Sequence, residues 1–137
     1  MDKPNPIDEE YIFNKGLIIS STNLHGIITY VNRKFCEISG YSKEELKGKN
    51  HNIVRHPDMP KAAFSEIWDS IQANKAWVGI IKNLRKDGHY YWVYAHISPI
   101  ESNDQVIGYT AARRPASRLE IEETIPVYQT LLEKENK

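Results

Sequence analysis

The sequence contains very little cysteine and has no long hydrophobic run. Cys36 is the single cysteine among 137 residues, so the chain cannot form an internal disulfide and offers no second thiol for zinc. No apolar stretch approaches the roughly 20 residues that a membrane-spanning helix requires. The segment 1–10 is polar and contains two prolines, which is not typical of a secretory signal. These absences predict a reduced, cytoplasmic protein without a direct membrane span.

An excess of charge of one sign is also absent. Lys and Arg together number 18, as do Asp and Glu, so the sequence predicts neither a basic surface for nucleic acid nor a polybasic membrane patch. The motifs of a nucleophile elbow, a phosphate-binding loop and a metalloprotease are missing, so we expect no enzyme. The 40% hydrophobic and 10% aromatic residues are enough for one domain with one core.

The apolar pattern and the turn residues predict an α+β fold. Asp87-Gly88 is a strong hairpin signal, and Phe64, Ile67, Trp68 and Ile71 form one apolar stripe at helical spacing. We expect five strands, at residues 17–22, 26–31, 77–85, 89–100 and 105–113. We expect helices at residues 32–39, from 42 to about 47, at 60–74 and at 117–137, the last kinked or divided by Pro126. Segregated strands and helices favour a five-stranded antiparallel sheet with short helices over one face and a C-terminal helical tail.

The most informative segment is the polar loop His51–Pro60, with the sequence HNIVRHPDMP. Its side chains have the donors and acceptors to bind a phosphate or a ribose, with Arg55 the natural partner of an anion. The alternative is a self-contained loop in which Asp58 caps the helix that begins at Pro60. Metal binding by His51, His56 and Asp58 has suitable ligand types but lacks the spacing of a strong metal site.

Alternation along two of the predicted strands assigns side chains to faces. Trp77, Gly79, Ile81 and Asn83 share one face, where Asn83 needs a partner if it is buried and Gly79 leaves room for a flat ligand. The alternative is an Asn on a solvated face beside a core Trp. On the following strand we expect an outward aromatic patch, covered by the segment around Tyr11–Phe13, a second copy or a membrane partner; its residues are Tyr90, Trp92, Tyr94 and His96.

Two segments, in this order of elements, resemble PAS domains. Asn32 and the run CEISGYSKEEL, Cys36–Leu46, are similar to the first PAS helix and the turn after it. The run NLRKDGHYYWV, Asn83–Val93, is similar to the PAS hairpin. The resemblance covers roughly residues 15–115 and implies the PAS fold.

Two further segments resemble the FAD-binding PAS domains of bacterial aerotaxis receptors. These are HNIVRHPDMPKAAF, His51–Phe64, and RRPASRLEIEE, Arg113–Glu123. The resemblance implies non-covalent FAD held by the Arg, His and Asp of the polar loop, a Trp in the flavin pocket and an Asn at the flavin ring edge. The candidate cofactor contacts are therefore Asn32, His51, Asn52, Arg55, His56, Asp58, Trp68, Trp77 and Asn83.

The same resemblance implies a redox sensor for aerotaxis or energy taxis, similar to the soluble half of two-protein receptors. Its partner would be a membrane-bound chemotaxis-type signalling protein, and a homodimer is possible. We expect a lead at 1–16, a PAS sensor domain at 17–115 and a helical extension at 116–137. The alternatives are a cofactor-free PAS module for dimerisation or scaffolding, and a haem sensor with a His ligand. Adduct photochemistry is not expected, because the loop contains no thiol.

Overall fold

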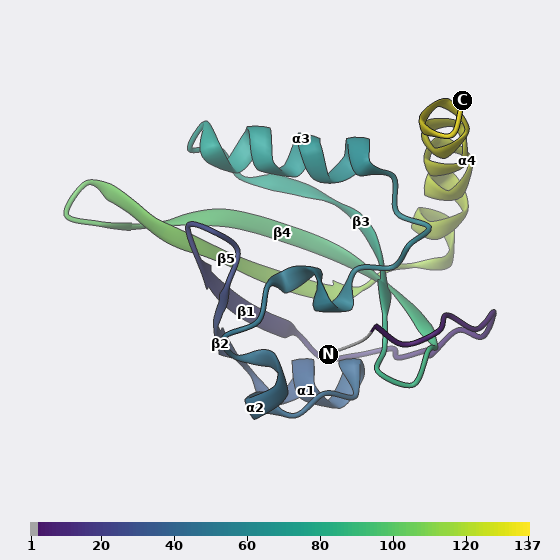
Figure 1. The fold of residues 1–137 in the computed structure, drawn as a ribbon, viewed down its shortest axis with the longest axis horizontal. Helices are drawn as coiled ribbons and strands as arrows, with labels where there is room; N and C mark the ends of the chain where they lie inside the picture. Colours follow the sequence, from purple (N-terminus) through teal and green to yellow (C-terminus); the bar gives the residue numbers. More distant parts are fainter. Residues whose placement is uncertain (1–2) are drawn as a thin grey trace.

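A five-stranded antiparallel sheet forms the centre of the structure, a computed structural model that describes residues 3–137 (Figure 1). Across the sheet the strands follow the order β2 (Ile28–Val31), β1 (Ile18–Asn23), β5 (Gln105–Pro115), β4 (Tyr90–Ser102) and β3 (Trp77–Leu84). The predicted α+β class and all five strands are confirmed, with bounds that shift by a few residues. The turn Asp87-Gly88 joins β3 to β4 as expected, with Gly88 at a φ of 94°.

The helical segments between β2 and β3 cover the inner face of this sheet. They are α1 (Arg33–Ser39), α2 (Lys43–Leu46), the 3-10 helix η1 (His51–Val54) and α3 (Lys61–Gln72). Local signals place them: the Asn32 side chain accepts from the Phe35 N–H, and Ser42 forms a capping box with Glu45. None of the helices among the described residues combines the length and apolar character that crossing a bilayer requires.

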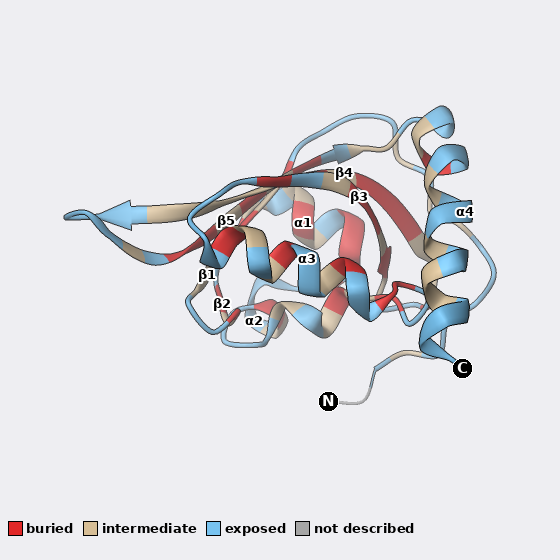
Figure 2. Cartoon of the chain, turned by 90° about the horizontal axis from the view of Figure 1, so that it is seen from above, coloured by how far each residue is buried: buried red, intermediate tan, exposed pale blue. Residues whose placement is uncertain are grey.

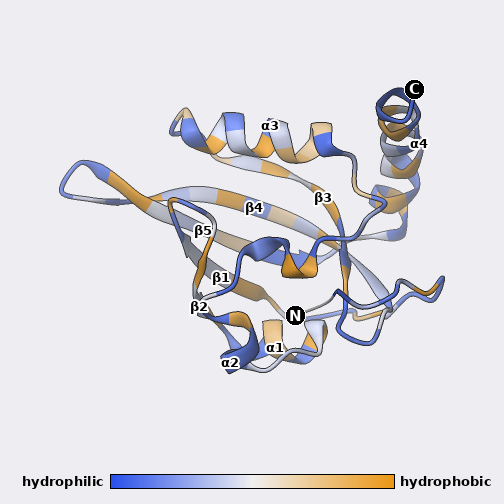
Figure 3. Cartoon of the chain, viewed as in Figure 1, coloured by the Kyte–Doolittle hydropathy of each residue, from blue (hydrophilic) through white to orange (hydrophobic). Residues whose placement is uncertain are grey.

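The core lies between the inner face of the sheet and these helices (Figure 2). Tyr91, Val93 and Ala95 of β4 are almost fully buried there, as the strand alternation predicts. They belong to one cluster with side chains from every covering helix, including Phe35, Ile38, Leu46, Val54, Ile67 and Ile71. In Figure 3 the tip between β4 and β5 is hydrophilic, in keeping with its exposure to solvent. The core therefore fixes α1, η1 and α3 against the part of the sheet that lines the site below.

The outward patch expected on β4 is only partly exposed: His96 is exposed, Tyr90 and Tyr94 are half-buried, and Trp92 is buried. Helix α4 (Arg118–Glu135) lies against this side, where Ile121 packs with Ile80 and with Trp92, which is only 8% exposed. The Tyr128 hydroxyl donates to the Ile80 carbonyl. A cover over Trp92 was expected, but the chain's own C-terminal helix provides it, a long-range contact that strand alternation cannot reveal.

Helix α4 is a single helix, so the expected division at Pro126 is wrong. Pro126 lies inside α4 and is exposed to solvent. A proline there removes one hydrogen bond to the carbonyl four residues earlier, and Glu122, which owns that carbonyl, is also exposed. Water can replace the missing donor, and the helix continues to Glu135.

The far end of α4 contacts the start of α3. Pro60 provides no side-chain cap for α3, and the Glu135 carboxylate instead accepts from the N–H groups of Lys61 and Ala62, each at 3.0 Å. A carboxylate at a helix N-terminus is favoured by the helix dipole. These bonds lower the pKa of Glu135. Glu135, rather than Asp58, therefore caps α3.

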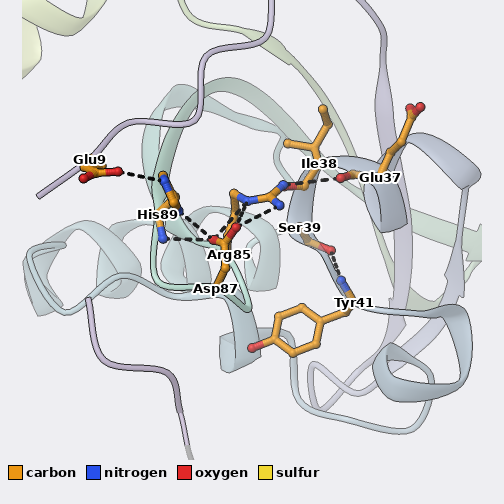
Figure 4. A network of polar contacts seen from close by, with 8 residues as sticks. All are labelled: Glu9, Glu37, Ile38, Ser39, Tyr41, Arg85, Asp87 and His89. Carbon is orange, nitrogen blue, oxygen red and sulfur yellow. Dashed lines mark hydrogen bonds and ion pairs between the residues drawn. The ribbon is translucent and has the colours of Figure 1, made fainter. Parts of the chain in front are cut away.

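The N-terminal segment is bound to the β3–β4 hairpin (Figure 4). Glu10 pairs in parallel with Tyr90, and Glu9 contacts the His89 ring at 3.1 Å. Arg85 donates to the Ile38 carbonyl at the end of α1 and to the Asp87 carboxylate. The guanidinium thus joins the hairpin to α1. This network closes the end of the domain beside the chain's N-terminal segment.

Candidate functional site: a cavity under the sheet

A cavity of about 320 Å³ lies between the inner face of the sheet and the helices η1 and α3. Its volume is at the lower end of the range of small-molecule sites. Most of its wall is apolar, from α3 and from inward-facing strand residues: Phe64, Ile67, Trp68, Ile71, Ile81, Ile97, Tyr109 and Ala111. Its polar side chains gather on β1, η1, β3 and β5. An apolar cavity with a few directed polar groups is typical of a binding site for a flat, partly polar molecule.

The polar loop enters this site as η1, which the sequence did not predict. Two contacts fix the loop: the His51 N–H donates to the Gly26 carbonyl at 2.9 Å, and the Arg55 backbone pairs with Asn83 on β3. Further along, the Lys82 N–H donates to the Met59 sulfur at 3.4 Å. The loop therefore covers the otherwise unpaired edge of β3 and holds its side chains at the cavity.

Five of the nine candidate residues line the cavity. They are His51, Asn52, Arg55, Trp68 and Asn83. Asn83 is buried, so it does not lie on a solvated strand face. The Arg55 guanidinium stacks on the Phe64 ring with its carbon 3.8 Å from the ring centroid, and it retains some exposure to solvent. Arg55 therefore remains free to meet an anionic group.

The other four candidates lie outside the cavity wall. Asn32 caps α1 and also accepts from the Ile19 N–H at 3.1 Å, which ties α1 to β1. His56 is buried, and its Nδ1 atom accepts from the Asp58 N–H at 2.9 Å. The Asp58 carboxylate is largely exposed and pairs with Lys82 at 3.0 Å. Burial and the nearby Lys82 charge lower the pKa of His56 to about 4, so its ring is neutral near neutral pH. His56 and Asp58 shape the turn that presents Arg55.

Trp77, the fourth, begins β3 and donates from its indole N–H to Glu66 at 3.3 Å. It shares a face with Gly79, as the alternation predicts. A Cβ at Gly79 would lie 2.5 Å from the Trp77 ring, so the indole itself fills the space that Gly79 leaves. The expectation that Gly79 makes room for a ligand is wrong, because the absent side chain makes room for the Trp77 indole.

Sequence reasoning missed the residues that close the polar end of the cavity, Ser20 on β1 and Arg113 on β5. Arg113 is 3% exposed; its guanidinium donates to the Ser20 hydroxyl at 2.7 Å and to the His51 Nε2 atom at 3.0 Å. The signal for Arg113 was its period-two spacing from Tyr109 and Ala111. This spacing places a charged residue on the buried face of a strand.

The electrostatics of this end favour a neutral histidine beside a charged arginine. Burial first, and then the Arg113 charge, lower the pKa of His51 to about 3. Burial lowers the pKa of Arg113 to about 10, which leaves it protonated at neutral pH. The unprotonated Nε2 atom of His51 then accepts hydrogen bonds from Arg113 and Ser20. Within residues 3–137, no group of three or more His, Cys, Asp or Glu side chains is arranged to hold a metal ion.

The two neutral histidines make an acid-sensitive fold. Both His51 and His56 have a folded-state pKa below the ordinary value of 6.5, so the unfolded chain binds more protons and stability falls as the pH falls below that value. As the pH falls from about 6 to about 5, each of these two histidines lowers the free energy of unfolding by an amount approaching about 1.4 kcal/mol. Urea unfolding measured across this window checks the slope, which His51→Gln is expected to reduce by about half. An unchanged slope in His51→Gln would contradict the neutral assignment.

At the cavity end the buried Arg113 Nε atom has no hydrogen-bond partner among the described residues. The buried Tyr91 hydroxyl oxygen near Arg113 also has none, but Tyr91 is not part of the cavity wall. Burial raises the pKa of Tyr91 to about 12, so the hydroxyl keeps its proton. Buried donors and acceptors are normally satisfied. An unpaired Arg113 Nε donor on the wall of an apolar cavity fits a ligand that brings a hydrogen-bond acceptor, as the edge of a flavin ring does.

Comparisons with known proteins agree with this fold. The family model described as the PAS fold matches residues 28–113. The chain is 43% identical over 114 residues to the aerotaxis receptor of Escherichia coli (strain K12), covering 83% of this chain and 22% of that protein. It is 29% identical over 117 residues to a nitrogen fixation regulatory protein of Klebsiella pneumoniae, covering 84% and 24%. The chain thus spans less than a quarter of the length of either relative.

Solved structures give the same result. A crystal structure of a PAS domain from Colwellia psychrerythraea superposes with a TM-score of 0.68 at 30% identity, covering 74% of this chain and 87% of that one. The light state of the blue-light photoreceptor Aureochrome1 LOV has a TM-score of 0.69 at 18% identity, covering 88% and 91%, and shares the fold. The matched segment includes η1, α3 and the cavity-lining residues of β3, β4 and β5, while β1 precedes it. The chain belongs to the PAS family.

Proposed function

We propose that this chain is a PAS redox sensor that binds FAD in the cavity and passes its redox state to a signalling partner. The observation that carries the proposal is the cavity itself, in which an apolar wall meets Arg55, Asn83 and Arg113. The similarity to the aerotaxis receptor over 83% of the chain supports the same choice of ligand.

The cavity residues suit different parts of this cofactor. The side chains of Trp68 and its apolar neighbours offer a surface for the flat ring, and buried Asn83 offers both a donor and an acceptor to the ring edge. Arg55 suits a phosphate, and His51 and Asn52 complete the contacts from η1. In this proposal Asn32, His56, Asp58 and Trp77 act indirectly, by holding α1, the polar loop and β3 in place.

FAD supplies reversible electron transfer when it is bound. A change of electron count alters which ring atoms donate and accept hydrogen bonds, and Asn83 can reorient its amide in response. A sensor requires a partner affinity that differs between the two states. The proposed partner is a membrane-bound chemotaxis-type signalling protein that meets this chain in the cytoplasm. Homodimer formation and a non-enzymatic role are part of the same proposal.

The direct test is FAD binding by the purified protein. We expect yellow protein with a flavin absorption spectrum that dithionite bleaches. Arg55→Ala is expected to weaken FAD binding by about 2 kcal/mol, or about thirtyfold, because a charge-assisted contact to phosphate is lost. Titration of the apo protein with FAD, followed by fluorescence quenching, measures the change.

Arg33→Ala is the matched control, since Arg33 is an exposed arginine on α1 away from the cavity wall. It should bind FAD like the wild type. Wild-type protein that remains colourless in excess FAD would contradict the proposal and favour the scaffold alternative. A Soret band would favour haem.

A further inference from the structure

Arg113 is a buried cation that the fold leaves without a counter-charge. Its side chain extends from β5, contacts Ser20 on β1 and His51 on η1, and lies with its guanidinium carbon 4.8 Å from the Phe35 ring centroid on α1. From β4 the neighbouring group is the Tyr91 hydroxyl. None of these neighbours carries negative charge near neutral pH, because His51 is neutral and Tyr91 keeps its proton.

An uncompensated buried charge is unfavourable, and proteins normally pair it. In the described part of the chain no ion pair joins Arg113 to a carboxylate, and its Nε atom has no hydrogen-bond partner. Because Arg113 also lines the cavity, the missing charge can be supplied from the cavity side. The position therefore favours a ligand whose buried part is negatively charged in at least one of its states.

We propose that Arg113 is the specificity residue that holds the reduced flavin ring as an anion. This inference rests on the proposed function. The oxidised ring is neutral; uptake of two electrons and one proton gives a monoanion, and a second proton would neutralise it. The electrons come from an external reductant, which is dithionite in the test below. The positive charge of Arg113 takes the place of the second proton, so it stabilises the reduced ring more than the oxidised one.

The expected effect is a change in the preference for the reduced cofactor. Arg113→Gln keeps hydrogen-bonding groups beside Ser20 and His51 but removes the charge. It should lower the ratio of the affinity for reduced FAD to the affinity for oxidised FAD by about tenfold. Arg113→Lys keeps the charge and should retain most of that ratio. Both affinities are measured by anaerobic titration of apo protein.

The midpoint potential gives a second readout. In the wild type, one proton per two electrons makes the potential fall with pH at half the slope expected for two protons. The slope should approach the two-proton value in Arg113→Gln at mildly acid pH, together with a lower potential. Spectroelectrochemistry of the FAD-loaded protein measures both, and the spectrum of the reduced protein separately reports whether the ring is anionic or neutral.

Arg33→Gln is the control, because it removes one positive charge outside the cavity wall and should leave the ratio and the slope unchanged. If Arg113→Gln is too unstable to purify, the role of Arg113 is tested by the slope of midpoint potential against pH in the wild type and by the affinity ratio in Arg113→Lys. A two-proton slope in the wild type, or an unchanged ratio in Arg113→Gln, would overturn the role of Arg113 while the proposed function stands. Failure of the wild type to bind FAD would overturn both.

Discussion

Replacing Phe35 by alanine is expected to lower the free energy of unfolding by about 3–5 kcal/mol, the range for removing a fully buried aromatic side chain. Phe35 is 1% exposed and lies between the His51 ring, at 5.8 Å between centroids, and the Arg113 guanidinium. Its removal leaves a void and exposes a buried cation to that void, so both packing and electrostatics act in the same direction. Guanidinium chloride unfolding measures the loss.

Ile12→Ala is the control for Phe35→Ala. Ile12 is 72% exposed, and its truncation should change stability by no more than about 0.5 kcal/mol. A loss below about 1 kcal/mol in Phe35→Ala would mean that the surrounding side chains close the void. The positions of the His51 and Arg113 side chains would then not depend on the Phe35 ring.

Trp92→Asp is expected to lower the free energy of unfolding by at least about 3–5 kcal/mol. The substitution removes a large aromatic side chain from beneath α4 and places a carboxylate beside Ile80 and Ile121. We expect α4 to detach before the rest of the domain unfolds, because its remaining sheet contacts are polar: the Tyr128 hydroxyl on the Ile80 carbonyl and the Glu120 carboxylate on Arg114 of β5. Limited proteolysis should therefore cut first within α4, and urea unfolding should show the loss of stability.

Val78→Asp separates this effect from a change in surface charge. Val78 lies on β3, two residues from Ile80, and is about half exposed, so a carboxylate there remains hydrated and stability should change little. A stable Trp92→Asp protein with an intact α4 but altered self-association would restore the outward patch that the sequence suggested.

The sequence predicts the fold well because its signals are local. The box at Ser42, the cap at Asn32 and the turn Asp87-Gly88 each involve residues within a few positions of one another, and the structure confirms all three. Family resemblance then placed these elements in the correct architecture. Element bounds differ by one to two residues in most cases, since helix and strand ends depend on packing.

The site was predicted only in part, because its polar end is assembled from distant segments. Ser20 and Arg113 are 93 positions apart in the sequence, yet their side chains form a hydrogen bond. Asp58 shows the opposite case. As a loop carboxylate it suggested a cofactor contact or a helix cap, but in the structure it pairs with Lys82 of β3. Periodicity identifies a face of a strand, and only the tertiary fold decides which partner meets that face.

The Glu135 carboxylate at the first turn of α3 has a mechanical consequence. Helix α4 is held at one end by Ile121 and near its middle by Tyr128, both against the strand side of the domain, and at the other end by α3. Because α4 is attached to both the sheet and α3, it opposes any change in the distance between these two parts of the domain. If α3 were to move away from β3 on ligand binding, α4 would therefore have to bend or lose the hydrogen bonds of Glu135 to the start of α3.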